Sequence, residues 1–175
     1  KYPTFASMMS QPLAERLRPK TLDDYIGQKH LVGQGAVLRK MIDAGRVPSF
    51  ILWGPPGVGK TTLAQIIANK LDAPFYTLSA ISSGVKDVRE VIEKAKSNRF
   101  FNTVSPILFI DEIHRFSKSQ QDSLLNAVET GVVTLIGATT ENPSLEVIRP
   151  LLSLLGRRCP EVAEYSGTGG VCRGE

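Results

Sequence analysis

Cysteine is scarce in this sequence. The 175 residues include two, Cys159 and Cys172, and both lie near the C-terminal end. Neither belongs to a set of metal-ligand residues, so the sequence indicates neither a disulfide scaffold nor a zinc site. Such sparing use of cysteine is typical of the reducing cytoplasm, and we expect a cytoplasmic protein.

Long hydrophobic runs are absent as well. No apolar run approaches the roughly 20 residues that a membrane-spanning helix needs, and no signal-peptide core appears near the N-terminus. We therefore expect no membrane partner. Hydrophobic residues nevertheless form 42% of the chain, which is enough for one sizeable core and favours a single domain.

A strong charge of one sign is also lacking. The net charge is +4 and the isoelectric point is about 9.2, values that permit contact with nucleic acid without requiring it. Basic residues are spread along the chain, as on an ordinary solvated surface. Charge alone therefore does not identify DNA as a partner.

The glycine-rich segment 54–61 is the most informative part of the sequence. It fits the pattern G-x-x-x-x-G-K-[ST], the Walker A motif or P-loop. An apolar run at 50–53 precedes it, and apolar residues with helical spacing follow it from Leu63 to Leu71. A strand, a glycine turn and a helix in this order place backbone N–H groups around a triphosphate. The predicted nucleotide contacts are Gly54, Pro55, Pro56, Gly57, Val58, Gly59, Lys60, Thr61 and Thr62.

Two side chains of this loop have predicted roles in binding. Lys60 can reach the β- and γ-phosphates, and the hydroxyl of Thr61 can bind Mg²⁺. The alternative is a glycine-rich turn with an incidental lysine, but it does not account for the strand and helix patterns on either side. The sequence therefore predicts a nucleoside triphosphate site.

A second motif predicts hydrolysis. The short apolar run 106–110 ends in Asp111 and Glu112, 51 residues beyond Lys60, an interval that fits one βαβ unit. Asp111 can hold Mg²⁺ and its water shell, and Glu112 can orient and deprotonate the attacking water, as in a Walker B motif. The alternative is an acidic cap of the following helix. The position relative to the P-loop favours the catalytic interpretation.

A third element is the apolar segment 132–140, which ends in two threonines. Ligands of parallel α/β sheets lie at the carboxyl ends of the strands, so we expect Thr140 near the γ-phosphate. Threonine is common in strands, and on its own this pattern leaves a purely structural role equally open.

Together these motifs, in this order, resemble the AAA+ ATPases. A closer resemblance is to the replication-associated recombination ATPases, relatives of the clamp loaders and of the Holliday-junction branch-migration motor. It covers about residues 12–153. The segments that carry it are 12–19, 24–28, 51–57, 111–116 and 138–144.

The resemblance implies roles for further residues. Tyr25 and Ile26 match a segment that lies against the adenine, and Thr140 matches the sensor-one position. Ser79, at the end of the second strand, is a candidate to restrain Glu112. The resemblance also implies ATP and Mg²⁺ as cofactors. DNA forks, gaps or junctions are the implied partners, together with a homo-oligomer of the full-length protein and replication proteins such as single-strand binding protein.

The segment after Ser153 departs from the family. An arginine that acts as a finger on the neighbouring subunit normally follows Leu-Leu-Ser, whereas here the arginine-cysteine pair Arg158-Cys159 comes four residues late, directly after Arg157. We expect a flexible leader at 1–11, a core at 12–153 and an atypical, disordered or non-native tail at 154–175, with no strand or helix pattern after Pro160. The helical lid domain is expected to be absent, and the apolar residues 151–155 are expected to be exposed. Weak hydrolysis by this chain follows from these expectations.

The predicted fold class is α/β, a P-loop NTPase core with a parallel sheet between helices on both faces. Its strands are expected near residues 50, 76, 108 and 135, with a fifth missing or malformed. The predicted function is Mg²⁺-dependent ATP hydrolysis by an AAA+ domain of a DNA replication, recombination or repair factor. Two alternatives remain open: a nucleotide-gated loader or adaptor subunit with little turnover, and a P-loop kinase.

Overall fold

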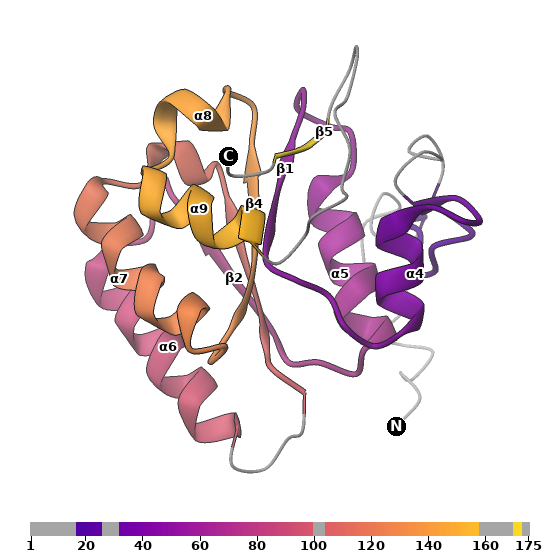
Figure 1. Cartoon of the computed structure of the whole chain (residues 1–175), viewed down its shortest axis with the longest axis horizontal. Coiled ribbons are helices and arrows are strands. Elements are labelled where there is room, and N and C mark those ends of the chain that lie inside the picture. Colours follow the sequence, from indigo (N-terminus) through magenta and orange to yellow (C-terminus); the bar gives the residue numbers. More distant parts are fainter. Residues whose placement is uncertain (1–16, 26–31, 100–103, 158–169, 173–175) are drawn as a thin grey trace.

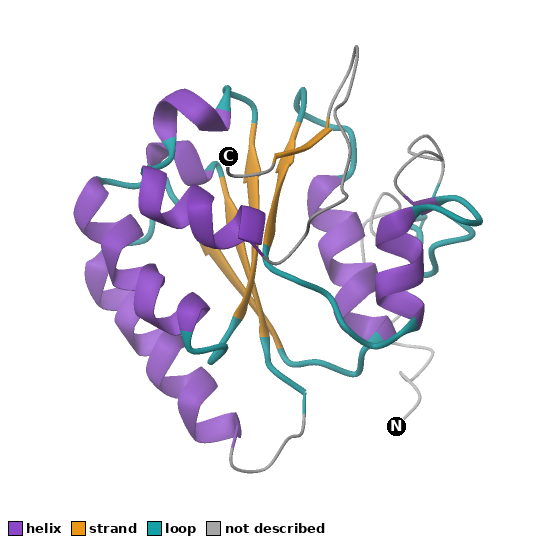
Figure 2. Cartoon of the chain, in the orientation of Figure 1, coloured by secondary structure: helices purple, strands orange, loops and turns teal. Residues whose placement is uncertain are grey.

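The computed structural model describes residues 17–25, 32–99, 104–157 and 170–172. Helices and strands alternate along the chain, as Figure 2 shows. The elements, labelled as in Figure 1, are α4 (Val37–Asp43), β1 (Phe50–Trp53), α5 (Lys60–Lys70), β2 (Phe75–Ser79), α6 (Val85–Arg99), β3 (Ile107–Asp111), the 3₁₀ turn η1 (Ile113–Arg115), α7 (Lys118–Glu129), β4 (Thr134–Thr139), α8 (Pro143–Glu146), α9 (Arg149–Arg157) and β5 (Gly170–Cys172).

The five strands form one sheet in the order β2-β3-β4-β1-β5. Strands β1 to β4 pair in parallel, and β5 pairs antiparallel with β1. The chain crosses from β1 to β2 at the far edge and then returns through β3 to β4, which lies beside β1. The carboxyl ends of the four parallel strands therefore meet at one edge of the sheet.

Helices cover both faces of the sheet, as predicted (Figure 1). Alternate strand residues point to opposite faces. Phe50, Phe109 and Ile136 pack with buried residues of α4 and α5 on one face. On the other face, Ile51 and Leu108 pack with buried residues of α6, α7 and α9. The apolar runs of the parallel strands are thus buried on both sides, which explains why they read as continuous rather than alternating patterns.

Helix α7 illustrates how local sequence sets the bounds of an element. Ser117 Oγ accepts a hydrogen bond from the backbone N–H of Gln120, and Gln120 Oε1 accepts one from the backbone N–H of Ser117. This capping box satisfies two backbone donors at the start of the helix. Gly131 adopts a φ of +69° directly after the helix, a conformation that glycine takes without steric cost.

The four predicted parallel strands are confirmed, with one change of bounds. The apolar segment predicted from residue 132 begins as a strand only at Thr134. The backbone N–H groups of Val132 and Val133 donate to the carbonyl of Ala127 instead. Because these two residues close the end of α7, they are unavailable to the sheet.

The expectation of a disordered tail from residue 154 is wrong for residues 154–157, which complete α9. Leu151 and Leu155 are spaced one helical turn apart, and their exposed fractions are 0% and 1%. Leu152 is also buried. The prediction of an exposed apolar edge at 151–155 is therefore wrong, because this side of α9 packs against the core.

The fifth strand is present, short and antiparallel. Gly170–Cys172 pairs with Ile51, Leu52 and Trp53 of β1. The predicted leader at 1–11 and most of the predicted tail, 158–169 and 173–175, lie outside the described residues. Within the described ranges, no helix is both long and apolar enough to cross a membrane.

One buried side chain links the segment before β1 to β4, and its removal is a test of the packing. Ser49 is 6% exposed, and its Oγ accepts a hydrogen bond of 2.8 Å from the backbone N–H of Leu135. We expect Ser49→Ala to lower the free energy of unfolding by about 1–3 kcal/mol, because a buried N–H loses its acceptor.

Chemical denaturation of the parent and the variant measures this difference. Ser119→Ala, on the exposed surface of α7, is the matched control and should change the free energy of unfolding by less than about 0.5 kcal/mol. Equal stability of the parent and Ser49→Ala would contradict the assignment.

Candidate functional site

The candidate site lies at the edge of the sheet where β1, β3 and β4 end. In Figure 1 the carboxyl ends of β1 and β4 lie at the top, next to helix α8. Trp53 at the end of β1 pairs in register with Thr139 at the end of β4. The backbone N–H of Gly54 then donates to the carbonyl of Thr139 at 3.1 Å. The first residue of the P-loop is therefore hydrogen-bonded to the last residue of β4.

The P-loop has the backbone conformation that a phosphate site needs. Gly57 and Gly59 have φ values of +78° and +87°, which residues with a Cβ adopt rarely. Gly59 is the N-cap of α5, and no side chain caps the first turn of that helix. The N–H groups of this first turn are thus available to an anion at the helix N-terminus.

Lys60 is held within its own loop. Its Nζ donates to the carbonyl oxygens of Gly54 and Pro55 at 2.8 and 2.9 Å. Burial lowers the pKa of Lys60 from its ordinary value, and the negative charges of Glu112 and Asp111 oppose that shift. The predicted cation and the two predicted carboxylates, from separate motifs, are therefore close enough to interact.

Tyr25 packs directly on the P-loop. Its hydroxyl donates to the carbonyl of Val58 at 3.0 Å. A Cβ at Gly59 would lie 3.0 Å from Tyr25 Oη and 3.1 Å from Cε2, so the ring occupies the space beside this glycine. Burial raises the pKa of Tyr25. The structure places this predicted adenine-segment residue against the loop, while Ile26 lies outside the described residues.

Asp111 and Glu112 have different backbone positions at the end of β3. Asp111 is the last residue of β3. Glu112 has left-handed backbone angles, φ +53° and ψ +49°, and precedes the 3₁₀ turn η1. Such a conformation is uncommon for a residue with a side chain. It turns the chain so that the carboxylate of Glu112 faces the end of β4.

Thr140 lies beside Glu112. Its hydroxyl donates to Glu112 Oε2 at 3.1 Å. The structure thus brings together the three residues predicted for catalysis: Lys60 at the start of α5, Glu112 after β3 and Thr140 after β4. The predicted approach of Thr140 to a γ-phosphate remains a prediction.

Two residues without a role in the sequence analysis also belong to this cluster. His114 Nδ1 lies 3.2 Å from Glu112 Oε2 and 2.9 Å from Thr139 Oγ1. The sequence contained His114 only as part of a segment that supports the family resemblance. A polar residue two positions after the acidic pair, within a tight turn, is the signal that could have indicated it.

Ser79 makes different contacts from those that its candidate role implies. It pairs in register with Asp111 across β2 and β3, but its hydroxyl accepts from the backbone N–H of Ile81 at 3.4 Å. Within the described residues, the side-chain contacts of Glu112 are with Thr140 and His114. The restraint of Glu112 by Ser79 therefore remains a prediction without a contact to support it.

The donor groups of the site fit a magnesium–nucleotide complex. Left-handed glycines open the loop backbone, and Lys60 supplies a cation beside it. Thr61, in the first turn of α5, and Asp111 supply hydroxyl and carboxylate oxygens, the ligands that Mg²⁺ prefers when it keeps most of its water shell. The described residues contain no group of three or more acidic, histidine or cysteine side chains arranged to hold a metal ion by themselves, and a magnesium site of this kind does not need one.

Comparisons with known proteins agree with this geometry. A family model for the ATPase family associated with various cellular activities (AAA) matches residues 50–164. The replication-associated recombination protein A of Haemophilus influenzae is 54% identical over 149 residues, which are 85% of this chain and 33% of that protein. The ATPase WRNIP1 of Dictyostelium discoideum is 54% identical over 142 residues, which are 81% of this chain and 16% of that protein. The chain thus spans a third or less of the length of these relatives.

Solved structures give the same result for the fold. The RuvB Holliday junction branch migration motor of Thermotoga maritima has a TM-score of 0.64 and 35% identity, covering 80% of this chain and 47% of that chain. A point mutant of the same motor protein has a TM-score of 0.66 and 34% identity, covering 81% of this chain and 47% of that chain. The predicted P-loop NTPase fold and the predicted family resemblance are confirmed.

A close approach between β4 and η1 sets the position of Glu112 and can be tested. A Cβ at Gly137 would lie 3.2 Å from Ile113 Cδ1 and 3.3 Å from Ile51 Cγ1. We expect Gly137→Ala to lower the free energy of unfolding by about 1–3 kcal/mol, because the added methyl overfills a packed core. Thermal or chemical unfolding measures this change.

The double variant Gly137→Ala/Ile113→Val is the control, because valine lacks the Cδ1 atom that lies nearest to the added methyl. The stability lost through Gly137→Ala should be smaller in the Ile113→Val background than in the parent background. Equal losses in the two backgrounds would show that the two side chains do not compete for space.

Proposed function

This chain belongs to the AAA family of ATPases, and on that premise we propose that it binds ATP with Mg²⁺ at residues 54–62 and hydrolyses the terminal phosphate bond. The observation that carries the proposal is the hydrogen bond between Thr140 and Glu112 beside Lys60. It joins residues from the ends of β3 and β4 into one polar cluster next to the P-loop. Such a cluster has no evident role in packing the core.

Binding is assigned to the loop and to the start of α5. The backbone N–H groups of the loop donate to phosphate oxygens, and Lys60 exchanges its contacts with the Gly54 and Pro55 carbonyls for contacts with the phosphates. Thr61 and Asp111 hold the Mg²⁺. When bound there, the ion would supply positive charge against the phosphates. We propose that Tyr25 and Ile26 border the adenine. Tyr25 also supports the loop through its hydrogen bond to the carbonyl of Val58.

Hydrolysis is assigned to Glu112 and Thr140. Glu112 accepts a proton from the attacking water, which raises the nucleophilicity of the water oxygen. Thr140 orients the carboxylate by donating to Oε2. The nucleotide lies on the same edge of the sheet as both side chains, in keeping with the position of ligands in parallel α/β folds.

The biological context is proposed from the relatives. The names of those relatives refer to replication-associated recombination and to Holliday junction branch migration. We propose that the chain is the ATPase part of a factor that acts on DNA forks, gaps or junctions and assembles with copies of itself in the cytoplasm. Single-strand binding protein is a candidate partner. Because the chain spans a third of its relatives, these partners concern the whole protein.

A nucleotide-gated adaptor with little turnover is the principal alternative. Both functions use the same binding residues, so phosphate release by the full-length protein, measured with and without DNA, distinguishes them. A P-loop kinase would need an acceptor molecule, and release of free phosphate in the absence of any acceptor would exclude it.

We further propose that this chain alone turns over slowly. Leu154 stands where the family has the arginine directly after Leu-Leu-Ser. An arginine finger contributes roughly 10³- to 10⁵-fold in rate in the GTPases where it has been isolated. Steady-state phosphate release should therefore be close to background, and brisk turnover by a defined oligomer of this chain would contradict the proposal.

Lys60→Ala tests the binding site. We expect calorimetric titration with Mg-ATP to show at least about a 100-fold loss of affinity, because the phosphates lose their mobile cation in a partly buried site. Lys70→Ala is the matched control, since Lys70 ends the same helix and forms an exposed ion pair with Asp43. Undiminished binding by Lys60→Ala would exclude the P-loop assignment.

Glu112→Gln tests the catalytic assignment. The amide cannot take a proton from water, so in the full-length protein single-turnover cleavage of γ-labelled ATP should slow by about 10²-fold or more while the dissociation constant of ATP stays within about twofold. Glu146→Gln, on the exposed surface of α8, is the control. Cleavage by Glu112→Gln at the parent rate would show that Glu112 only caps the turn.

A further inference from the structure

A buried hydrogen-bond chain lies beneath Glu112. His114 Nδ1 is 2.9 Å from Thr139 Oγ1 and 3.2 Å from Glu112 Oε2. Thr139 is fully buried, the side chain of His114 is 10% exposed and that of Glu112 is 23% exposed. The chain therefore runs from the core at Thr139 through His114 to the carboxylate at the edge of the site.

The contacts of Thr139 decide which atoms carry the hydrogens. Its hydroxyl has one proton, and it donates that proton to the carbonyl of Glu141 at 3.1 Å. The same oxygen accepts the backbone N–H of Glu141 at 3.0 Å. The hydroxyl is thus used as a donor toward Glu141 and remains an acceptor toward His114.

The contact between His114 Nδ1 and Glu112 also requires a hydrogen. An ionised carboxylate only accepts hydrogen bonds, so a bare Nδ1 would place two acceptors 3.2 Å apart. A proton on Nδ1 satisfies both contacts, because Glu112 Oε2 and Thr139 Oγ1 are both acceptors within hydrogen-bond distance of this nitrogen. The hydrogen-bond geometry therefore favours the form of His114 that is protonated at Nδ1.

We propose that His114, itself held by Thr139, is a positioning residue for Glu112, an inference that rests on the catalytic role given to Glu112 above. Within the described residues, both side-chain contacts of Glu112 use Oε2, one from Thr140 and one from His114. Two donors on separate elements fix the plane of the carboxylate. Oε1 is then the oxygen that faces the attacking water.

Core packing also supports the position of His114. Ile113 is fully buried and packs against Gly137 of β4, which seats η1 on that strand. Thr139 lies two residues beyond Gly137 on the same strand. His114 is therefore placed by core packing as well as by its own hydrogen bonds, as a positioning residue requires.

Nuclear magnetic resonance of the parent chain tests the proton position without any activity measurement. Long-range ¹H–¹⁵N correlation spectra of imidazole rings distinguish a protonated from a bare Nδ1, and the His114→Asn variant identifies the signal of His114 by its loss. We expect a protonated Nδ1 in the parent. A neutral ring protonated only at Nε2 would overturn the proposal.

Two histidine substitutions test the effect on catalysis. In His114→Asn the side-chain amide N–H takes approximately the place of Nδ1, whereas His114→Gln moves it to the place of Nε2. In the full-length protein we expect single-turnover ATP cleavage within about threefold of the parent for His114→Asn and about tenfold slower or more for His114→Gln. The dissociation constant of ATP should remain within about twofold for both variants.

The possible outcomes separate this inference from the proposed function. If the full-length parent binds ATP but does not cleave it in a single turnover, the proposed hydrolysis fails, while the spectra of this chain still test the His114–Glu112 contact. If the parent cleaves ATP and both variants match it, the positioning role fails alone. Faster cleavage by His114→Gln would also overturn the proposal. If thermal melts show that neither variant is folded, the protonation of His114 Nδ1 in the spectra of the parent decides whether the proposal stands.

Discussion

Strand β4 holds the site together because it lies between β1 and β3 and pairs with both. The P-loop follows β1, and the acidic pair lies at the end of β3. These two strands are not neighbours in the sheet, so strand pairing does not join the two motifs directly. The register of β4 fixes both, through the bond from Gly54 to Thr139 and the packing of Gly137 against Ile113. A slip of one residue in this strand would turn its side chains to the opposite face and would separate Thr140 from Glu112.

Most of the fold could be predicted from local patterns. Continuous apolar runs identified the four parallel strands because a strand covered on both faces has no polar side. The helix after Asp111 was predictable from the spacing of its apolar residues and its stop at Gly131. The P-loop was the clearest case, since its glycines are needed for backbone conformations that the structure contains at Gly57 and Gly59. The burial of α9 was missed because the apparent loss of family pattern outweighed the helical spacing of Leu151 and Leu155.

The polar part of the site was predictable only in part. Lys60, Glu112 and Thr140 were found because each follows a strand in a parallel sheet, and the topology brings such positions together. His114 and Thr139 are 25 residues apart in the sequence, and no local pattern indicates that they touch. The contact of Tyr25 with Val58 spans 33 residues and was missed for the same reason. Contacts of this kind depend on how the turns after the strands fold back, which the periodicity of a single segment does not encode.

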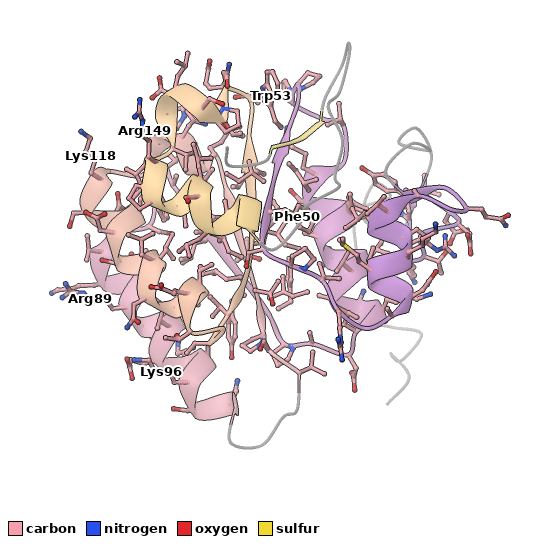
Figure 3. The ribbon with its side chains drawn as sticks, viewed as in Figure 1. Phe50, Trp53, Arg89, Lys96, Lys118 and Arg149 are labelled. Carbon is pink, nitrogen blue, oxygen red and sulfur yellow. The ribbon has the colours of Figure 1, made fainter. Side chains whose placement is uncertain are left out.

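The position of Trp53 has an optical consequence. It is the only tryptophan in the 175 residues, and it ends β1 directly before the first glycine of the P-loop. Its side chain is 37% exposed, and Figure 3 shows it at the end of the strand, at the opposite end from Phe50. Indole emission responds to the polarity around the ring. The chain therefore contains one built-in fluorophore at the edge of its candidate site, and the light it emits reports on this corner of the molecule without a label.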